Sequence, residues 1–495
     1  MATATAVYKN FINGQWVDGD AGELQVLNPA DQDQLLSRFS MASTDQTQQA
    51  LQAAQDAFQG WRQTPPPQRA RIVRKALQIA EEREDQIARD MCLEAGKVLS
   101  DARGEVMKGC NLLEFYAGEG LRFMGDAAPS ELANNLLFTK REPLGAVSII
   151  TPWNFPWAIP CWKIAPALVA GNTIVFKPAS FTPLSAYHLA KCFEDAGLPP
   201  GVLNLVVGSG SKVGNELIHA DKVCGISFTG SNEVGKQIEK AASERGTKLC
   251  CELGGKNPCV VMADADLDAA LAGVLKGAFG ASGQRCTATS RLIVEESIAD
   301  EFAARVAEGA NALKVGPGIN DDVDMGPVID QSQLDTVLGF IESGHKDGFK
   351  LLSGGERVTE NGLDKGFFVR PTVFDHVDQN SYLAQEEVFG PVLSIIRAKN
   401  YEEAVEMANN TKYGLSSSIY TRNINKAMRF TDDIEAGMVH INSPTLGGEA
   451  QVPFGGIKAS GIGDREMAKE GLHFFTELKT VFLDYTGGAR KSNIY

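Results

Sequence analysis

The fold of this chain is decided between residues 145 and 252, where five apolar runs recur: AVSIIT (146–151), TIVFK (173–177), VLNLVV (202–207), GISF (225–228) and KLCCE (248–252). A segment with helical spacing of its apolar residues separates each run from the next. Strands that are apolar along their whole length and alternate with helices are typical of a parallel sheet covered on both faces. We therefore expect an α/β fold built on a parallel sheet.

Polar or small residues follow each of these runs. In open parallel sheets, ligands bind beyond the carboxyl ends of the strands, so a binding site is expected at this edge. The residues at or just beyond the strand ends are Asn154, Lys177, Gly208, Gly230 and Glu252.

Two glycine-containing loops at the same edge are candidates for holding a phosphate. The first contains Gly208, Gly210 and Gly214, and its G-x-G-x-x-x-G spacing is a weak form of the dinucleotide fingerprint. The second, FTGSNEVG (228–235), joins a strand to a helix, so glycine, the Ser231 hydroxyl and free helical N–H groups lie close together. Taken alone, either loop is more often an ordinary turn.

The flanking segments are less informative. Residues 8–40 alternate short strands with turns, including a hairpin centred on Asn13-Gly14. Helical spacing begins at Thr44 and is broken by three prolines at 65–67. Helices at 69–95, with a break near Arg83, and at 100–118 are expected only to cover the sheet.

A second α/β pattern follows a turn-rich link at 253–258. Its expected helices are 267–279, 299–312, 333–344, 401–408 and 424–431. Its expected strands are 292–294, 368–374, 392–398, 416–420 and 438–441, and a last strand at 478–485 precedes a polar tail.

Composition limits the class of protein. A chain of 495 residues has room for two to four domains. The formal net charge of −15 argues against nucleic acid and anionic membranes as partners, because both require basic surface. It still permits an anionic small substrate, since a pocket can be locally positive.

The cysteines and the first residues indicate the cellular compartment, and the histidines indicate whether a metal site is expected. The nine cysteines include no CxxC pair, and Met1-Ala2-Thr3-Ala4 leads into polar sequence rather than a signal peptide. We therefore expect free thiols and a cytoplasmic protein. No apolar run is long enough to span a bilayer. The six histidines show no HxxxH or HExxH spacing, so no metal site is expected.

The interpretation of the cysteine in the short stretch Gly283-Gln284-Arg285-Cys286-Thr287 depends on motifs elsewhere in the chain. A lone cysteine is more often a buried, inert thiol. Here, however, it is one of seven motifs that occur in order and together resemble the NAD(P)-dependent aldehyde dehydrogenase superfamily. They are TPWNFP (151–156), FKP (176–178), FTGS (228–231), ELGGK (252–256), GQRCT (283–287), EVFGP (387–391) and PFGG (453–456).

This resemblance covers essentially the whole chain and implies three parts. A Rossmann-like cofactor domain would comprise residues 1–126 and 144–253, and a catalytic domain residues 254–474. A small β oligomerisation element would be formed by a hairpin at 127–143 and the segment 475–495. The family implies a homodimer or homotetramer.

The chemistry of the family suits these residue types. Adding the Cys286 thiolate to an aldehyde gives a tetrahedral oxyanion, which can expel hydride to the cofactor. The resemblance implies that the Asn154 amide and the Cys286 backbone N–H stabilise this oxyanion. Glu252 matches the general base that activates water to hydrolyse the thioester, and its presence is typical of hydrolytic rather than coenzyme A-acylating members. Alone, Asn154 would be a turn residue and Glu252 a solvated charge, so a catalytically inactive structural relative is the remote alternative.

The resemblance also implies the cofactor residues, with NADP or NAD as the cofactor. Lys177 and Glu387 match positions that hold ribose hydroxyls, Ser231 a pyrophosphate contact and Phe389 a neighbour of the nicotinamide ribose. Many NAD-preferring members carry Glu where this chain has Ser180, so we expect NADP to be accepted. The full set is Thr151, Pro152, Trp153, Lys177, Ser180, Gly210, Gly214, Phe228, Gly230, Ser231, Val234, Glu387 and Phe389.

Two features bear on the aldehyde. Arg285 can pair with a carboxylate or phosphate, although a plain ion pair is its alternative. Glycines at 447–448 would leave room for the substrate in the pocket, whereas Trp157 and Trp162 would add aromatic bulk to it. The runs around Cys286 and Gly448 resemble enzymes that oxidise 2-oxoglutarate semialdehyde. A broad or betaine-type aldehyde specificity is the alternative. The expected substrate residues are Phe155, Trp162, Arg285, Thr287 and Phe454.

Overall fold

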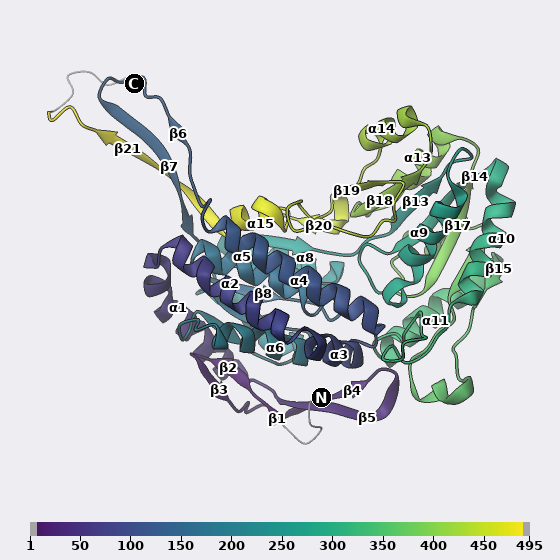
Figure 1. Ribbon diagram of the computed structural model, residues 1–495, viewed down its shortest axis with the longest axis horizontal. Coiled ribbons are helices and arrows are strands. Elements are labelled where there is room, and N and C mark those ends of the chain that lie inside the picture. Colours follow the sequence, from purple (N-terminus) through teal and green to yellow (C-terminus); the bar gives the residue numbers. More distant parts are fainter. Residues whose placement is uncertain (1–6, 489–495) are drawn as a thin grey trace.

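A computed structural model of the chain describes residues 7–488. The expectations for Met1–Ala4 and for the end of the polar tail concern residues outside this range. Two layered α/β bodies lie side by side, and an arm of strands projects from the first of them (Figure 1).

The first body contains the expected parallel sheet. Strands β12, β11, β8, β9 and β10 run parallel, and antiparallel strands extend the sheet at both edges. The hairpin between β2 and β3 turns at Asn13 and Gly14, both with positive φ, as the Asn-Gly pair predicted. The strand order is β20 (Gly461–Ile462), β12 (Lys248–Glu252), β11 (Gly225–Thr229), β8 (Ala146–Ile150), β9 (Thr173–Lys177), β10 (Leu203–Leu205), β2 (Asn10–Ile12) and β3 (Gln15–Val17).

Successive side chains of these strands enter two different cores, because strand residues alternate between the faces of a sheet. Val147 and Ile149 of β8 face one core, and Ala146 and Ile150 face the other. The first core is covered by α2 (Pro66–Glu82), α3 (Glu84–Ala95), α4 (Leu99–Glu119), α5 (Ala158–Ala170) and α6 (Pro183–Asp195). The second is covered by α1 (Thr44–Gln63), α7 (Asn215–His219) and α8 (Asn232–Arg245).

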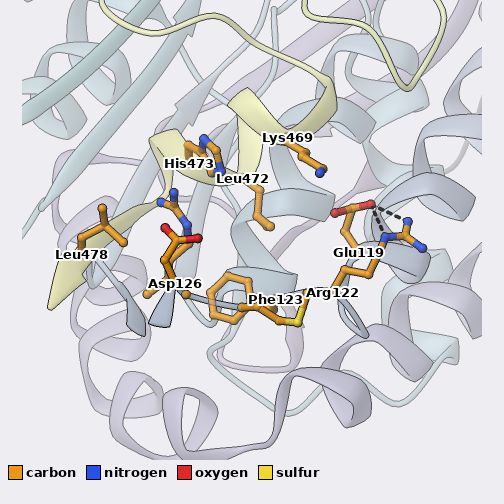
Figure 2. Close-up of a pocket in the computed structure, with 11 residues that line it drawn as sticks. Glu119, Arg122, Phe123, Asp126, Lys469, Leu472, His473 and Leu478 are labelled. Atoms are coloured by element: carbon orange, nitrogen blue, oxygen red, sulfur yellow. Dashed lines mark hydrogen bonds and ion pairs between the residues drawn. The ribbon is translucent and has the colours of Figure 1, made fainter. Parts of the chain in front are cut away.

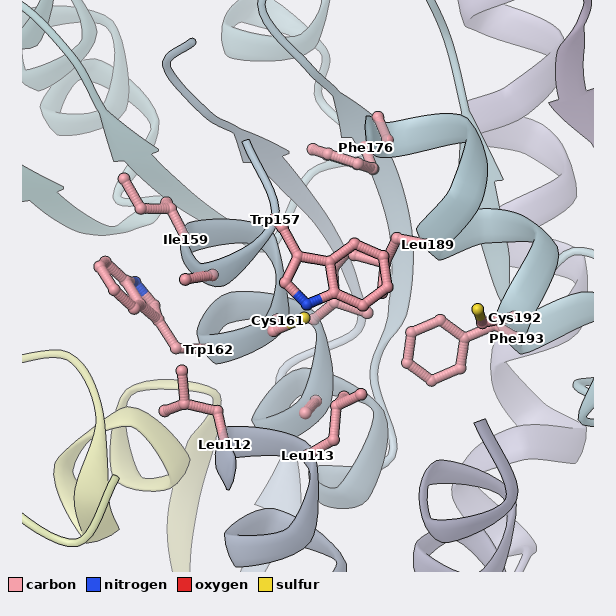
Figure 3. Close-up of a cluster of buried hydrophobic side chains, with 14 of the residues drawn as sticks. Leu112, Leu113, Trp157, Ile159, Cys161, Trp162, Phe176, Leu189, Cys192 and Phe193 are labelled. Carbon is pink, nitrogen blue, oxygen red and sulfur yellow. The ribbon is translucent and has the colours of Figure 1, made fainter. Parts of the chain in front are cut away.

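Two expectations for this body are wrong. The helix expected from residue 69 begins at Pro66, because proline is well suited to the first helical turn, where its missing N–H costs nothing. Trp157 is fully buried in the first core, among Cys161, Leu189 and Phe193, and does not reach a substrate (Figure 3). Its ring fills the space above Gly109 of α4, where any larger residue would overlap it.

The second body contains a seven-stranded sheet with one interior strand that the sequence did not predict. β13 (Asn257–Val261) pairs with β14 and β18, although residues 253–258 were expected to be a link. A register irregularity at Asn257 and Pro258 accommodates the proline, which cannot donate to the ladder. The strand order is β15 (Lys350–Ser353), β16 (Thr372–Asp375), β17 (Val392–Ala398), β14 (Thr289–Glu295), β13, β18 (Ser416–Tyr420) and β19 (Met438–Ile441).

Helices cover both faces of the second sheet, and the expected ones are present. Their bounds are α9 (Leu267–Phe279), α10 (Glu296–Ala312), α11 (Gln331–Lys346), α12 (Tyr382–Gln385), α13 (Tyr401–Asn409) and α14 (Ile424–Asp433). A further sheet near the N-terminus contains β1 (Val7–Tyr8), β5 (Asp31–Ser40) and β4 (Glu23–Asn28).

The arm is a three-stranded antiparallel sheet. β7 (Asn135–Pro143) pairs along its whole length with β21 (Thr476–Asp484), and β6 (Ala127–Ala128) completes it. α15 (Ala468–Phe474) leads into β21. A cavity of about 300 Å³ lies at the base of the arm, between Glu119, Asp126, Lys469 and His473 (Figure 2). None of the residues expected to act in catalysis or binding lines it.

Candidate active site

A tight turn after α9 presents Cys286. Ala281, Ser282 and Gly283 all have positive φ, a conformation that is costly for residues with a side chain. Tertiary hydrogen bonds hold the turn: the Ser282 hydroxyl donates to the Gly326 carbonyl at 2.8 Å, and the Ala281 N–H donates to Asp101 at 3.0 Å. A side chain at 283 would overlap the backbone of residue 390. Strain maintained in this way is common at functional sites.

Cys286 itself is a partly buried thiol at a cavity wall. Asn257 Nδ2 donates to the Cys286 carbonyl at 2.8 Å and fixes the backbone. Burial, followed by the charges of Glu387 and Glu252, raises the pKa of the thiol to about 12. Lys108 and the backbone N–H of Thr287 act in the opposite direction, lowering this pKa. All nine cysteines are free, and most of the others are buried in the cores.

Asn154 lies at the same cavity as Cys286. Its Nδ2 donates to the Gln284 carbonyl at 3.1 Å, and its buried Oδ1 has no hydrogen-bond partner in the described part of the chain. Lys97 Nζ donates to the Asn154 carbonyl at 2.7 Å and also pairs with Glu105. An amide donor therefore lies beside the thiol, on a backbone held by a buried charge.

Glu105 of α4 connects this arrangement to the fold. Its Oε1 accepts the N–H groups of Trp157 at 2.9 Å and Ala158 at 3.1 Å, at the start of α5. Its Oε2 pairs with Lys97. One buried carboxylate thus satisfies a helix N-terminus and the ammonium that positions Asn154.

Glu252 lies at the end of β12 and is 2% exposed. Its Oε1 is packed against Gly455, where a side chain would overlap it, and its Oε2 has no partner among residues 7–488. Burial, then the charge of Glu466, raises the pKa of Glu252 well above its ordinary value. In this position Glu252 does not line the cavity that contains Cys286 and Asn154.

A buried polar network lies next to Glu252. Lys163 of α5 pairs with Glu466 and donates to the Ser227 hydroxyl at 2.8 Å. The second oxygen of Glu466 accepts from Trp162 Nε1 at 2.7 Å. Trp162, expected as a substrate residue, is thereby fixed with its ring 5.3 Å from that of Phe454.

The cavity at Cys286 has a volume of about 250 Å³ and brings many of the expected cofactor residues together. Trp153 and Phe389 meet edge to face, with ring centroids 5.4 Å apart. Glu387 Oε1 accepts the Gly255 N–H at 2.9 Å, and burial raises the pKa of this carboxyl to about 7. The expected lining residues are Pro152, Trp153, Asn154, Gly230, Ser231, Cys286, Glu387 and Phe389, and those not anticipated are Ile159, Thr229, Leu253, Gly254 and Gln333.

The other expected cofactor residues lie outside this cavity. Within the described part of the chain, Lys177 Nζ donates only to the carbonyl of Pro178, at 3.0 Å, and burial lowers the pKa of the ammonium to about 8. Gly214 lies against the Lys177 side chain, and the Ser180 hydroxyl contacts the Gly208 carbonyl at 3.4 Å. Thr151 and Phe228 are buried, whereas Gly210 and Val234 are more exposed.

This surface fits a dinucleotide. Lys177 places a buried ammonium at the strand ends, and among residues 7–488 it has no carboxylate partner. Ser231 caps α8 by accepting the Val234 N–H, so further N–H groups of the helix start face outward. The carboxylate of Glu387 lines the cavity wall. Ammonium, helix N-terminus and carboxylate are the groups that bind phosphates and ribose hydroxyls.

The remaining expected substrate residues form two groups. Arg285 pairs with Asp101 at 3.0 Å and lies over the Phe155 ring at 5.6 Å, so the ion pair foreseen as its alternative is present. The Thr287 carbonyl accepts from the Thr445 hydroxyl at 2.7 Å, which anchors the glycine loop near Cys286.

Three residues of α4 belong to this site although the helix was expected only to cover the sheet. Asp101, Glu105 and Lys108 are three or four residues apart and therefore share one face. Charged residues on the inward face of a helix are a signal that the sequence offered. Lys97, just before the helix, joins them through Glu105.

Within residues 7–488, no helix has the length and apolarity needed to cross a membrane. The same residues contain no cluster of three or more His, Cys, Asp or Glu side chains suited to a metal ion.

Comparison with known proteins agrees with this geometry. A model of the aldehyde dehydrogenase family matches residues 16–481. The chain is 45% identical to the alpha-ketoglutaric semialdehyde dehydrogenase of Bacillus subtilis, over 97% of this chain and 99% of that one. It is 43% identical to the 2,5-dioxopentanoate dehydrogenase of Saccharolobus solfataricus, over 94% and 98%. A crystal structure of betaine aldehyde dehydrogenase from Staphylococcus aureus in complex with NAD+ matches with a TM-score of 0.95 at 33% identity, covering 99% of this chain and 97% of that chain. The chain belongs to the aldehyde dehydrogenase family and is an NAD(P)-dependent aldehyde dehydrogenase.

Proposed function

We propose that this enzyme oxidises a small carboxylated aldehyde, with 2-oxoglutarate semialdehyde as the first choice, to the corresponding acid. The observation that carries the proposal is the cavity where the Cys286 thiol, the Asn154 amide and the Glu387–Phe389 wall meet. The names of the two relatives above support the substrate. The fold neighbour that acts on betaine aldehyde supports the alternative of a broader or betaine-type specificity at lower identity.

The proposed chemistry follows from the side chains present. Cys286 loses its proton to a base and its sulfur adds to the aldehyde carbon, giving a thiohemiacetal oxyanion that Asn154 Nδ2 and the Cys286 N–H stabilise. Bound NAD(P) supplies the acceptor for the hydride that this carbon loses. The product is a thioester on Cys286, and water activated by Glu252 hydrolyses it to the acid and the free thiol.

Glu252 must change position for this last step. In its place against Gly455, burial and the charge of Glu466 raise the pKa of the carboxyl and so favour its neutral form. A general base must be ionised. We infer that the side chain turns toward the Cys286 cavity when the thioester is present.

The cofactor proposal extends to NADP. Ser180 beside the Gly208 carbonyl is uncharged, so it does not repel a 2′-phosphate as a glutamate would. We propose that NADP is accepted and preferred. A higher kcat/KM with NAD than with NADP would contradict the preference.

The arm supports a proposal about assembly. Leu136 on β7 and Phe482 and Leu483 on β21 are exposed apolar residues on a projecting sheet. Such surface is typical of an interface, and a homodimer or homotetramer would bury it. We propose the domain division given above, with residues 127–143 and 475 onward as the oligomerisation element. The free thiols favour a cytoplasmic protein.

An aldehyde panel with both cofactors tests the proposed function. We expect NAD(P)H absorbance to rise fastest with carboxylated aldehydes and to be abolished in Cys286→Ser. A faster reaction with betaine aldehyde or neutral aldehydes would favour the alternative specificity. Absence of turnover with every aldehyde would favour the inactive relative.

A further inference from the structure

A groove runs along α4 beside the site. Its volume is about 560 Å³, and small-molecule pockets span about 300–1,000 Å³. One wall is a helical stripe, and the other is the loop that follows Thr445. The lining residues include Gly104, Lys108, Asn111 and Phe115 on α4, and Gly448, Glu449, Ala450 and Gln451 on the loop.

Lys108 is an unpaired cation in this groove. Its Nζ lies 5.2 Å from the centroid of the Trp162 ring, and within residues 7–488 it forms no hydrogen bond or ion pair. Partly buried charges are normally paired, so a lone ammonium requires an explanation.

The charges closer to the thiol have partners, and the groove itself also contains the carboxylates of Glu114 and Glu449, neither of which forms an ion pair within residues 7–488. Glu105 pairs with Lys97, and Arg285 pairs with Asp101. Glu449 on the opposite wall accepts a hydrogen bond from Gln451. Lys108 is therefore the cation of the groove that is free to receive an anion.

The glycine loop keeps the space in front of this ammonium open. Gly448 has a φ of +150°, which residues with side chains rarely adopt. A Cβ there would lie 3.7 Å from Lys108 Nζ and 3.8 Å from Phe454 Cδ2. Any larger residue at 448 would occupy the position that an anion needs.

Lys108 is also within electrostatic reach of the reacting thiol. Its positive charge lowers the pKa of Cys286, and in return Cys286 raises that of Lys108, although burial lowers it overall. The Trp162 ring lies beneath this ammonium and 5.3 Å from the Phe454 ring, and a small substrate held at Cys286 by its aldehyde end would extend toward the ammonium.

We propose that the Lys108 ammonium binds the carboxylate at the far end of the aldehyde substrate and selects anionic aldehydes. This inference rests on the proposed function and names the residue that sets its specificity. It assigns the anion contact to Lys108, with Arg285 engaged by Asp101 and Phe155.

The test compares two five-carbon aldehydes, 5-oxopentanoate and pentanal, in the wild type and in Lys108→Met. Methionine keeps the length and apolar character of the stem and removes the charge. Because Lys108 also lowers the pKa of Cys286, some loss is expected with both aldehydes, but losing a charge-assisted hydrogen bond should lower the ratio of kcat/KM for 5-oxopentanoate to kcat/KM for pentanal about 10- to 100-fold. Arg103→Met is the matched control, because Arg103 is an exposed cation of the same helix that pairs with Asp85 outside the groove.

The outcomes distinguish a failure of the proposed function from a failure of the Lys108 assignment. A wild type that does not prefer 5-oxopentanoate to pentanal overturns the proposed function, and this inference with it. If the wild type prefers 5-oxopentanoate and Lys108→Met keeps that preference, only the assignment of the anion contact to Lys108 is overturned. Equal losses for both aldehydes also overturn it, because they would indicate a role in activating Cys286 or in folding.

A charge reversal gives a second, independent readout. Lys108→Glu should reject 5-oxopentanoate and gain activity with betaine aldehyde, whose trimethylammonium group carries a positive charge that the new carboxylate attracts. Lys108→Arg should keep the preference for the anion. Loss of that preference in Lys108→Arg, or its persistence in Lys108→Glu, contradicts the proposal even if Lys108→Met fails to fold.

Discussion

Replacing Glu105 by glutamine should destabilise the protein and weaken catalysis through a single buried contact. Glutamine keeps an oxygen to accept the N–H groups of Trp157 and Ala158, so the start of α5 retains its acceptor. What is lost is the charge opposite Lys97, and both side chains are almost fully buried. Breaking a buried ion pair by removing one partner costs about 3–5 kcal/mol, because the other charge is left uncompensated.

The cost is large enough to measure by thermal unfolding. A loss of about 1 kcal/mol lowers Tm by about 2–4 °C in domains of 150–250 residues, so Glu105→Gln should lower Tm by roughly 6–20 °C. The Asn154 carbonyl would also lose a well-placed Lys97, so kcat should fall further than KM for the cofactor rises. Asp85→Asn, which removes an exposed carboxylate paired with Arg89 and Arg103, should change Tm much less.

A double variant separates the loss of the ion pair from the loss of the Lys97 contact to Asn154. Lys97→Met with Glu105→Gln removes both charges, so it should be more stable than Glu105→Gln alone. The kcat defect should persist in the double variant, because Asn154 still lacks its ammonium. Additive losses of stability in the double variant, or an unchanged Tm in Glu105→Gln, would refute the account of this pair.

Three further predictions concern the site itself. Asn154→Ala should lower kcat by about 10²–10³-fold with a small effect on Tm, and retention of full kcat would exclude the amide as an oxyanion donor. Ser180→Glu should lower kcat/KM for NADP and leave that for NAD nearly unchanged, which steady-state assays with both cofactors measure. Because the pKa of Cys286 is raised to about 12, the thiolate fraction in the unliganded enzyme rises with pH. Alkylation of Cys286 by iodoacetamide, followed by mass spectrometry, should therefore accelerate about tenfold per pH unit from pH 7 to 9, and a plateau in this range would show a lower pKa.

The parallel sheet and the residues at its edge were predictable from the sequence, because buried strands are apolar along their length. β8, β9, β11 and β12 lie where their apolar runs indicated. β13 was not predictable in the same way, since Gly254, Gly255 and Pro258 are turn residues by local preference. Tertiary pairing on both sides of β13, with an irregularity at the proline, overrides that preference.

The contribution of α4 to the active site could not be predicted from the sequence, for a different reason. An amphipathic pattern shows which face of a helix is buried, but not what the charged residues on that face contact. Glu105 contacts groups about 50 residues away at the start of α5, and Lys108 faces a loop that follows Thr445. Trp157 and Trp162 lie five residues apart and both are buried in the first core (Figure 3), but only the Trp162 ring reaches the polar network beside Glu252, through its hydrogen bond to Glu466.

The intact mass of Glu252→Gln after one turnover shows whether a thioester forms on Cys286 and depends on Glu252 for its hydrolysis. We expect one equivalent of NAD(P)H per site when carboxylated aldehyde and cofactor are added. We also expect a protein whose mass has increased by the acyl group, with the modification mapped to Cys286, because the thioester forms but is not hydrolysed. Steady turnover without an adduct, or an adduct on another residue, would contradict the account.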